Sequence, residues 1–494
     1  MASKYELGLF NELEKLNNKL DKLMKQNKEQ SLTIYNLNLE IQKLNKTIKE
    51  KDEKIELLLE ENDRLKNKNN KNTTNSSKPS STNITTPKKK TGANLYNYRE
   101  KRNRSIGAQF GHTGKTLIKK DIEKLIKEKK LKVKIIMHKI KGKPGKIIEK
   151  YRLGIETNSI IEKHIFVCDK KATDKLPKEF YTDVTYDNSI KALSIELGSY
   201  NIISYDRLSD FFSVITKNII NISNGTLVNF LKEFGKKCMP TLNNLEKNIL
   251  NNKINFTDET STKFNKKNIY VRNYSNSDTV IYKAHLNKGH KPILEDNILP
   301  KFCGGIMGDH DTTLQKYGNQ NYECNIHLGR YLEELIQNIS YISWPLKMKE
   351  FIFRINNTKK IAESYKLNKF DKNKIKEYAN EFDTILKDAI QENKTIKSSF
   401  YKDKANKLYR RLKKYKKNHL YFIEDFNVPF DNNLSEQDLR IFKTKTKVSG
   451  GFRSLEVAKD YVNTLSIIKT SIKRNINPFQ SIQSIFNNEI LFAN

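Results

Sequence analysis

The chain has 494 residues, and its 92 Lys and Arg outnumber its 57 Asp and Glu, which gives a formal net charge of +35. So large an excess of positive charge favours a polyanionic partner, most simply a nucleic acid, although lysine-rich drift in an AT-rich genome would give the same balance. The length allows about two to four domains. No apolar run is long enough to cross a bilayer and no signal peptide opens the sequence, so we expect a cytoplasmic protein with no membrane segment.

Residues 1–68 are predicted to form a parallel coiled-coil dimer, because residues 9–68 keep an unbroken heptad repeat. The apolar residues at its a positions are Leu13, Leu20, Ile34, Ile41, Ile48 and Ile55, and those at its d positions are Leu16, Leu23, Leu37, Leu44, Leu58 and Leu65. Ile at a with Leu at d favours two parallel strands, and Asn27 and Asn62 at a fix the register. A long helix packed on its own domain is the alternative, although such a helix rarely keeps a strict period of about 3.5 residues.

Residues 69–115 are rich in Ser, Thr, Asn and Pro, which is typical of a disordered linker. This linker is basic, and its candidate DNA-binding residues are Lys88, Lys89, Lys90, Arg102 and Arg104. Such side chains can contact phosphates while the two tyrosines of YNYRE offer stacking surfaces. A solvated tether is the alternative interpretation.

Residues 116–180 alternate short β-like runs with turns such as GKPGK, so we predict a small β-rich module. His138, His164 and Cys168 lie in it, but no second Cys is near, so incidental side chains are favoured over a metal site. The four cysteines of the whole chain are far apart and form no CxxC pair; they are Cys168, Cys238, Cys303 and Cys324. This spacing argues against a disulfide scaffold or a zinc ribbon and fits a reducing compartment.

Residues 181–250 show the apolar spacing of helices. Ser223 precedes the run GTLVNFLKEF and is predicted to cap its helix. Short helices in this arrangement could form a reader of DNA similar to a helix-turn-helix, and plain helical packing is the alternative. We therefore predict a helical region that binds DNA.

Residues 254–311 predict a small sheet with an aspartate at the end of two strands. The β-rich runs are INFTD, KNIYVRNYS, TVIYKAHL and GGIMGDH, and KPILEDNIL before the last of them is helical. The turn NSD joins the second and third runs into a hairpin. Asp258 and Asp309 then end the first and fourth strands and can lie side by side at one edge of the sheet.

A third carboxylate, Glu436, follows in FDNNLSEQDLR. Carboxylates on a rigid frame can hold two hard divalent cations, which activate water and stabilise the leaving oxygen in phosphodiester cleavage. The acidic residues that adjoin the chosen three compete for the same role; they are Glu259, Asp311, Asp431 and Asp438. An acidic residue at a strand end is also commonly a turn or helix cap.

Beyond the sheet the sequence is mostly helical. A helix is predicted over QKYGNQNYECNIHLGRYLEELIQNI, with His327 and Arg330 on one face, and the Lys-rich stretch from about 345 to 418 continues as helices. The basic run at 410–419 is either a solvated helix face or a segment that follows a phosphate backbone. Residues 446–494 open with the glycines of VSGGFRS and form a C-terminal helical region.

Several segments, in the right order along nearly the whole chain, resemble the transposases of the insertion-sequence 66 family. They are the N-terminal zipper, SSKPSS followed by GAQFGHTGKTL, SYDRLSDFF followed by SNGTLVNFL, TDET, GGIMGDH, CNIHLGRYLEEL, and VPFDNNLSEQDLRIFKTKTKVSGGFRS. The last segment is the most specific of them.

The resemblance implies an α/β catalytic domain of the ribonuclease-H-like type over residues 251–445, with a helical insertion at about 312–430. Matched residue by residue, its acidic triad is Asp258, Asp309 and Glu436, which would hold two Mg²⁺ or Mn²⁺ ions. Family members usually carry a Cys-rich zinc-binding segment. Its counterpart here lacks the cysteine pairs, so we expect no structural zinc.

The resemblance also bears on the basic residues. His327 and Arg330 fall in the segment that resembles the family's CNxHLxREL pattern, from which HLGRYLEEL departs. We expect both to contact DNA, and Arg440 and Lys263 are candidates for phosphate contacts.

The implied function is DNA transposition: metal-dependent cleavage at transposon ends, then transfer of the freed 3′-hydroxyl into target DNA. A homodimer held by the zipper would bring two ends together at the prokaryotic nucleoid, with accessory proteins of the same element as further candidate partners. Two alternatives stay open: a catalytically inactive coiled-coil DNA-binding protein derived from a transposase, and a ribonuclease-H-like nuclease acting on other nucleic acid. The three retained carboxylates disfavour the first, and the zipper and the insertion disfavour the second.

Overall fold

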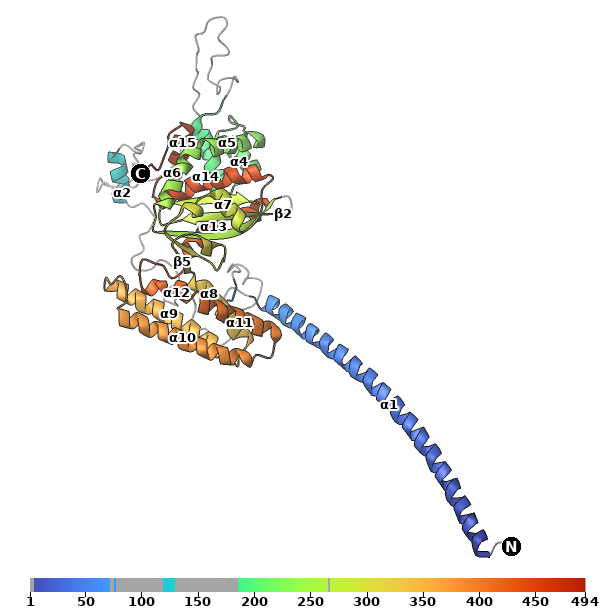
Figure 1. The fold of residues 1–494 in the computed structure, drawn as a ribbon. Helices are drawn as coiled ribbons and strands as arrows, with labels where there is room; N and C mark the ends of the chain where they lie inside the picture. The colour runs from blue at the N-terminus through green and yellow to red at the C-terminus, as the bar shows by residue number, and fades with distance from the viewer. Residues whose placement is uncertain (1–3, 72–74, 77–118, 129–184, 265–266, 494) are drawn as a thin grey trace, which may run out of the picture. The chain divides into compact units, whose positions relative to one another are not determined.

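The computed structural model describes residues 4–71, 75–76, 119–128, 185–264 and 267–493 (Figure 1). The chain divides into two compact units: a helical unit, from residues 1–88 and 327–427, and a sheet unit, from residues 89–326 and 428–494. Across the described ranges, no helix combines the length and the apolar character needed to cross a bilayer.

The sheet unit is built on a mixed five-stranded sheet with the strand order β3-β2-β1-β4-β5. The strands are β1 (Ile254–Phe264), β2 (Lys267–Ser275), β3 (Val280–His285), β4 (Gly305–Gly308) and β5 (Gln320–Glu323). β1, β2 and β3 pair antiparallel, whereas β4 runs parallel to β1 and β5 parallel to β4. The predicted hairpin between β2 and β3 is confirmed, and Asn276 N–H closes its turn on Thr279 O at 2.9 Å.

The first strand is longer than the sequence predicts. We expect a short strand that Asp258 ends, but β1 continues to Phe264 and pairs with β2 along the way, so Asp258 lies within the strand. The segment ETSTKF is polar and lacks the apolar alternation that marks a strand. It is extended because it pairs with β2, and the sequence pattern does not show that pairing. Its threonines nevertheless favour an extended backbone.

The fifth strand is a second correction. The sequence predicts one helix from residue 315 onward and a helical insertion from about 312, but Gln320–Glu323 form β5 and the helix α8 (Asn325–Asn338) begins after it. Four residues are too few to show an alternating pattern, and β5 depends on its backbone pairing with β4.

Helices cover the sheet and the exposed edge of β3. α13 (Asn433–Ser449) packs on β1 and β2, and α14 (Leu455–Lys473) packs on β3. Edge strands present unpaired N–H groups, and here Ser466 Oγ accepts from Tyr282 N–H at 2.9 Å and Thr470 Oγ1 from Val280 N–H at 3.1 Å. The side chains of α14 therefore satisfy the outer backbone of β3.

The helices of residues 181–250 share one hydrophobic core with the sheet and α14. They are α3 (Asn188–Ile195), the π-helical turn η4 (Glu196–Tyr200), α4 (Tyr205–Ile215), α5 (Asn224–Lys237) and α6 (Met239–Leu250). The predicted cap is confirmed, because Ser223 Oγ accepts from Thr226 N–H at 3.1 Å. The short elements α7 (His290–Asp296), η5 (Leu299–Lys301) and η6 (Leu314–Lys316), together with α15 (Pro478–Phe486), complete the unit.

The helical unit has its own core. Its helices are α8, α9 (Trp344–Ser364), α10 (Lys372–Lys394), α11 (Ser399–Lys414), α12 (Lys416–Leu420) and the turn η7 (Tyr421–Ile423). Trp344, Phe351 and Phe382 are buried between them, and Trp344 Nε1 donates to Asn393 Oδ1 at 2.9 Å. The Lys-rich stretch is therefore helical, as predicted.

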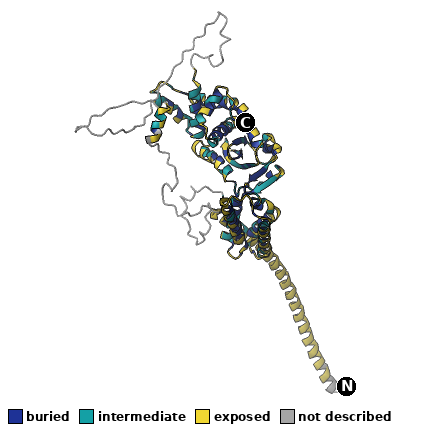
Figure 2. Cartoon of the chain, turned by 90° about the vertical axis from the view of Figure 1, so that its left-hand side faces the viewer, coloured by how far each residue is buried: buried dark blue, intermediate teal, exposed yellow. Residues whose placement is uncertain are grey.

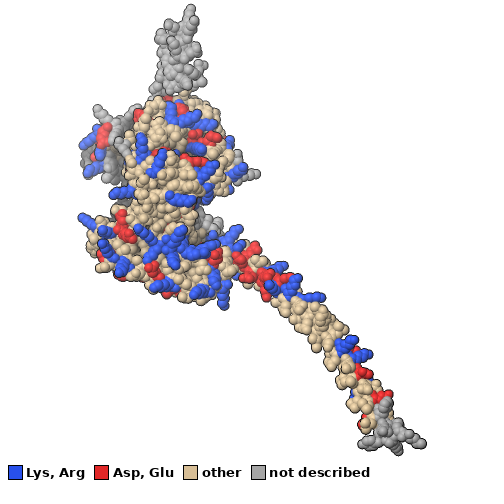
Figure 3. Space-filling view, in the orientation of Figure 1, with Lys and Arg blue, Asp and Glu red and all other residues tan. Residues whose placement is uncertain are grey.

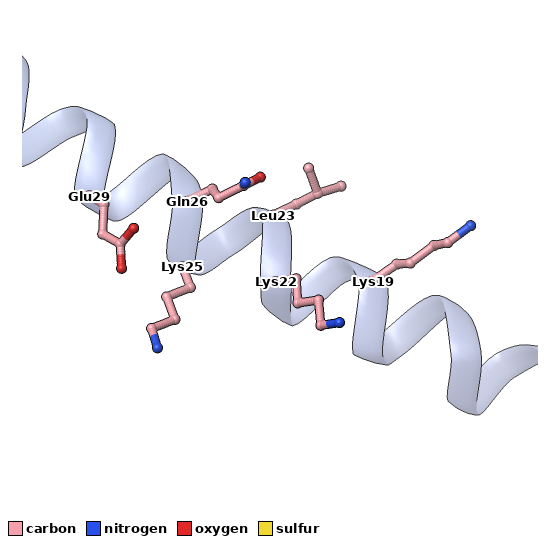
Figure 4. Close-up of a pocket in the computed structure, with 6 residues that line it drawn as sticks. All are labelled: Lys19, Lys22, Leu23, Lys25, Gln26 and Glu29. Carbon is pink, nitrogen blue, oxygen red and sulfur yellow. The ribbon is translucent and has the colours of Figure 1, made fainter.

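α1 (Lys4–Asn70) is one long helix whose heptad side chains lie in solvent (Figure 2). Leu37 is 52% exposed and Ile41 53% exposed. Figure 4 shows Leu23 projecting from the single helix among polar neighbours; these are Lys19, Lys22, Lys25, Gln26 and Glu29. A single chain therefore leaves the apolar seam of α1 uncovered.

Some predictions concern residues that lie outside the described ranges. The linker residues Lys88, Lys89, Lys90, Arg102 and Arg104 lie outside the described residues, as does most of the β-rich module predicted at 116–180. The described part of that module is the helix α2 (Lys119–Lys127). The linker, the module and the expected lack of zinc stay predictions.

Candidate active site

The pairing of β1 with β4 places two carboxylates at equivalent positions. The strands run parallel with Phe256 opposite Met307, so Asp258 and Asp309 each follow that pair by two residues. Asp258 N–H is held by Asn273 Oδ1 at 3.0 Å, and Asp309 Oδ1 accepts from the N–H of His310 at 2.8 Å. Both aspartates are half-buried.

Glu436 lies in the first turn of α13, and its charge is one of the causes that raise the pKa of Asp258. Asn432, immediately before the helix, donates from Nδ2 to Thr257 O at 2.9 Å. Asn273 Oδ1, which holds the backbone of Asp258, also accepts from Ser435 Oγ at 2.7 Å. The residues that precede Asp258 and Glu436 are thus both tied into one hydrogen-bonded frame.

The far end of α13 is tied to β1 as well. Thr446 Oγ1 lies 2.7 Å from Thr262 Oγ1, and Phe452 N–H donates to Lys263 O at 2.8 Å. Gly451, with φ of +124°, approaches Lys263 O so closely that a Cβ there would overlap it. The glycines of VSGGFRS therefore let the chain leave α13 directly against β1.

The pKa of Asp258 depends on the charges of the two other candidate carboxylates. The pKa of Asp258 is raised to about 7: burial is the largest cause, the charges of Asp309 and Glu436 add to the rise, and the Glu259 N–H and Arg272 oppose it. Like charges disfavour ionisation of a neighbour in this way. Among the described residues, no three His, Cys, Asp or Glu side chains are placed to hold one metal ion. Charge repulsion acts over longer distances than a metal–oxygen bond of about 2 Å, so it couples the three carboxylates although they are not in coordinating positions.

This donor set fits a hard divalent cation. It consists of carboxylate oxygens, which Mg²⁺ and Mn²⁺ prefer. A cation would also relieve the repulsion that raises the pKa of Asp258.

Two of the competing carboxylates are engaged by a buried arginine. Arg272, on β2, is 3% exposed and places Nη2 3.1 Å from Glu259 Oε2 and 3.4 Å from Asp311 Oδ2. Glu259 also pairs with Lys288 at 3.3 Å. Glu259 and Asp311 therefore form an ion-pair network beside the candidate site.

The other two competitors also have structural partners. Asp438 is buried, accepts from Ser275 Oγ at 2.6 Å and pairs with Lys473 at 2.7 Å, which fixes α13 to β2 and α14. Asp431 Oδ1 accepts from Asn433 N–H at 3.0 Å, as in a turn before a helix.

Other residues that hold the candidate site in place were not predicted from the sequence. Arg272 and Asn273 lie in a β-rich run with no signal beyond its strand pattern. Asn432 belongs to the specific segment FDNNLSEQDLR, which could have marked it. His310 Nδ1 lies 2.9 Å from the buried Glu323 Oε1 and thereby joins the segment after β4 to the end of β5.

The predicted basic residues are distributed over both units. His327 and Arg330 lie on α8 in the helical unit, where Arg330 Nη1 donates to His327 Nε2 at 3.0 Å. Arg440 is exposed on α13, one turn after Glu436. Lys263, on β1, donates to Asn268 Oδ1 at 2.9 Å beside a hollow that Lys267 and Tyr270 also line.

A comparison with known families decides what kind of protein carries this site. Residues 184–460, more than half of the chain, match the family described as Transposase IS66 family. The chain belongs to this family. The matched segment includes Asp258, Asp309 and Glu436, and no curated protein matches the chain. An IS66 transposase is a DNA-acting enzyme, and DDE transposases in general use divalent metal ions.

The carboxylate cluster predicts how the stability of this IS66 transposase depends on pH when metal is chelated. The folded-state pKa of Asp258, about 7, exceeds its ordinary value of 3.8. Between these values the folded protein binds more protons than the unfolded chain, so the free energy of unfolding falls as the pH rises. Asp309→Asn removes one repelling charge, lowers the pKa of Asp258 and makes this fall smaller, which urea unfolding across that pH range measures.

Asp431→Asn is the matched control, because it also neutralises an aspartate near α13 but one that is not among the causes of the Asp258 shift. It should leave the pH dependence close to that of the wild type. Equal pH dependence in wild type and Asp309→Asn would mean that Asp309 does not share the environment of Asp258.

Proposed function

We propose that this protein is a DDE transposase that cuts DNA at transposon ends and joins the freed ends to target DNA. The observation that carries the proposal is that the charges of Asp309 and Glu436 contribute to the raised pKa of Asp258, with all three residues inside the segment that matches the IS66 family. The order β3-β2-β1-β4-β5, with β4 and β5 parallel to β1, supports the ribonuclease-H-like fold that the resemblance implies.

Asp258, Asp309 and Glu436 would hold two Mg²⁺ or Mn²⁺ ions. When bound, such a pair supplies activation of the attacking oxygen and stabilisation of the leaving oxygen in phosphodiester chemistry. The protein itself supplies the positions: Asn273 fixes the backbone of Asp258, and Asn432 and Ser435 fix the start of the helix that carries Glu436.

Arg272 affects the proposed metal site in two ways. It binds Glu259 and Asp311, so these carboxylates do not compete for the ions, and its charge favours the ionised form of Asp258 that binds metal. Arg440 lies four residues after Glu436, so both project from the same side of α13. We therefore assign Arg440 to a phosphate of the DNA that enters the site.

We propose that α1 pairs with α1 of a second copy. Its Ile and Leu at a and d are exposed in the single chain, and a parallel two-stranded coiled coil would bury them. A dimer suits a reaction in which two transposon ends are held together. DNA reading by α3–α6, DNA contacts by His327 and Arg330, accessory proteins and association with the nucleoid stay predictions.

Ile41→Asp is predicted to convert the dimer into a monomer, because Ile41 occupies an a position in the middle of α1 and a carboxylate would be buried there. Leu39→Asp is the matched control, since Leu39 lies at an outer heptad position. Multi-angle light scattering distinguishes the two states. A wild-type protein that is monomeric at micromolar concentration would remove the zipper from the account.

Asp309→Asn and Glu436→Gln are each predicted to reduce Mg²⁺-dependent cleavage of labelled transposon-end DNA by at least about 10²-fold, because metal catalysis contributes several kcal/mol. Asp431→Asn should cleave like the wild type. A gel assay of nicked product, with DNA binding measured in parallel, checks both effects.

Cleavage that survives either substitution would show that other carboxylates hold the ions. Tight DNA binding by the wild type without cleavage would instead favour the inactive DNA-binding derivative.

A further inference from the structure

Most acidic side chains of α8–α11 already have a basic partner. Lys347 pairs with Asp388, Lys349 with Glu333, Arg354 with Glu381, Lys404 with Glu334, Lys407 with Asp403 and Lys416 with Asp383. Because Lys and Arg exceed Asp and Glu in this unit, some cations remain without a carboxylate. Figure 3 shows Lys and Arg gathered on the face of the helical unit in view.

Four of these cations lie at the end of α11 and the start of α12; they are Arg410, Lys413, Lys414 and Lys417, which we call the α11–α12 basic face. All four are exposed, and none forms an ion pair within the described residues. Lys413 and Lys414 follow Arg410 by three and four residues on α11, which is the spacing of one side of a helix, and Lys417 lies on α12 after the break at Tyr415. The three cations of α11 therefore present their charges in one direction.

The backbone under the basic face is held in place. Leu408, Leu412 and Leu420 are buried beneath it. Lys416, between the exposed lysines, turns the other way: its Nζ lies 2.7 Å from Asp383 and donates to Ala379 O at 2.9 Å, which fixes this segment to α10. The charges thus project from a fixed element, which lowers the entropy lost on binding.

Aromatic rings accompany two of the charges. Lys414 Nζ lies 5.0 Å from the centre of the Tyr415 ring and Lys417 Nζ 5.8 Å from that of Tyr421. Such contacts orient the lysine stems while the ammonium groups stay exposed.

We propose that the α11–α12 basic face binds the phosphate backbone of duplex DNA without reading its sequence. The four-residue step from Arg410 to Lys414 rises about 6 Å along α11, and duplex DNA carries about three phosphate charges over that length, so each of the three cations on α11 can face a phosphate while Lys417 extends the face onto α12. Three of the four cations are lysines, which act as point charges on phosphates rather than as readers of base edges. We name DNA as the ligand because of the proposed function. The charge of the face and its placement come from the structure and do not depend on that function.

The test is the affinity of the full-length protein for a fluorescent duplex of random sequence, titrated at several salt concentrations without divalent metal. The variant carries Arg410→Gln, Lys413→Gln, Lys414→Gln and Lys417→Gln. We expect its affinity to fall about tenfold or more, and its dependence on log salt to weaken by about 3 to 4, at about 0.9 per lost phosphate contact. Transposon-end DNA should show the same loss.

The matched control changes four exposed lysines of the same unit that do not share one helix face, Lys360→Gln, Lys366→Gln, Lys369→Gln and Lys376→Gln. It loses the same charge and should keep most of the affinity and the salt dependence. Thermal unfolding should show that both variants remain folded.

Equal losses of DNA affinity in the two variants would show that only net charge matters and would overturn the proposal. Unchanged DNA affinity in the variant of the α11–α12 basic face would overturn it too. If the basic-face variant lost affinity for single-stranded RNA but kept its affinity for duplex DNA, the face would bind RNA and the proposal would be wrong. Since no metal is present, these outcomes do not depend on cleavage, so failure of the proposed catalysis would be seen separately.

Discussion

The candidate site depends on a frame that keeps the charges of Asp309 and Glu436 near enough to act on Asp258. Burial and the carboxylates of Asp309 and Glu436 raise the pKa of Asp258 to about 7, so the metal-free protein gives up stability at neutral pH. Such a cluster persists only where the surrounding frame fixes it. Here the frame consists of the parallel register of β1 and β4, and of the buried amides of Asn273 and Asn432 that join α13 to β1.

The other acidic residues near the site differ from these three because basic side chains neutralise their charge. Glu259 and Asp311 share Arg272, and Asp438 is bound by Ser275 and Lys473. These partners neutralise negative charge that would otherwise add to the repulsion. A divalent cation would neutralise the charge of Asp258, Asp309 and Glu436 in the same way, which is the physical basis for assigning metal binding to them.

Local patterns predicted much of this arrangement. The β-rich runs INFTD and GGIMGDH located the strands that lead to both aspartates, the spacing around Ser223 located a cap, and the heptads of α1 follow from side chains at fixed intervals. What could not be predicted depends on partners distant in the sequence. β5 has only four residues and exists through pairing with β4, and the polar half of β1 exists through pairing with β2. Asn273 has no pattern of its own, because its role comes from Asp258 and Ser435 meeting it in space.

The measurement that tests the central claim most directly is a crystal structure of the protein with Mn²⁺, with the ions located by anomalous scattering. The account predicts two ions about 3.5–4 Å apart, with oxygens of Asp258, Asp309 and Glu436 as their protein ligands. Ions bound by Glu259, Asp311 or Asp438 instead, or Mn²⁺ that leaves the three carboxylates unbound, would contradict it.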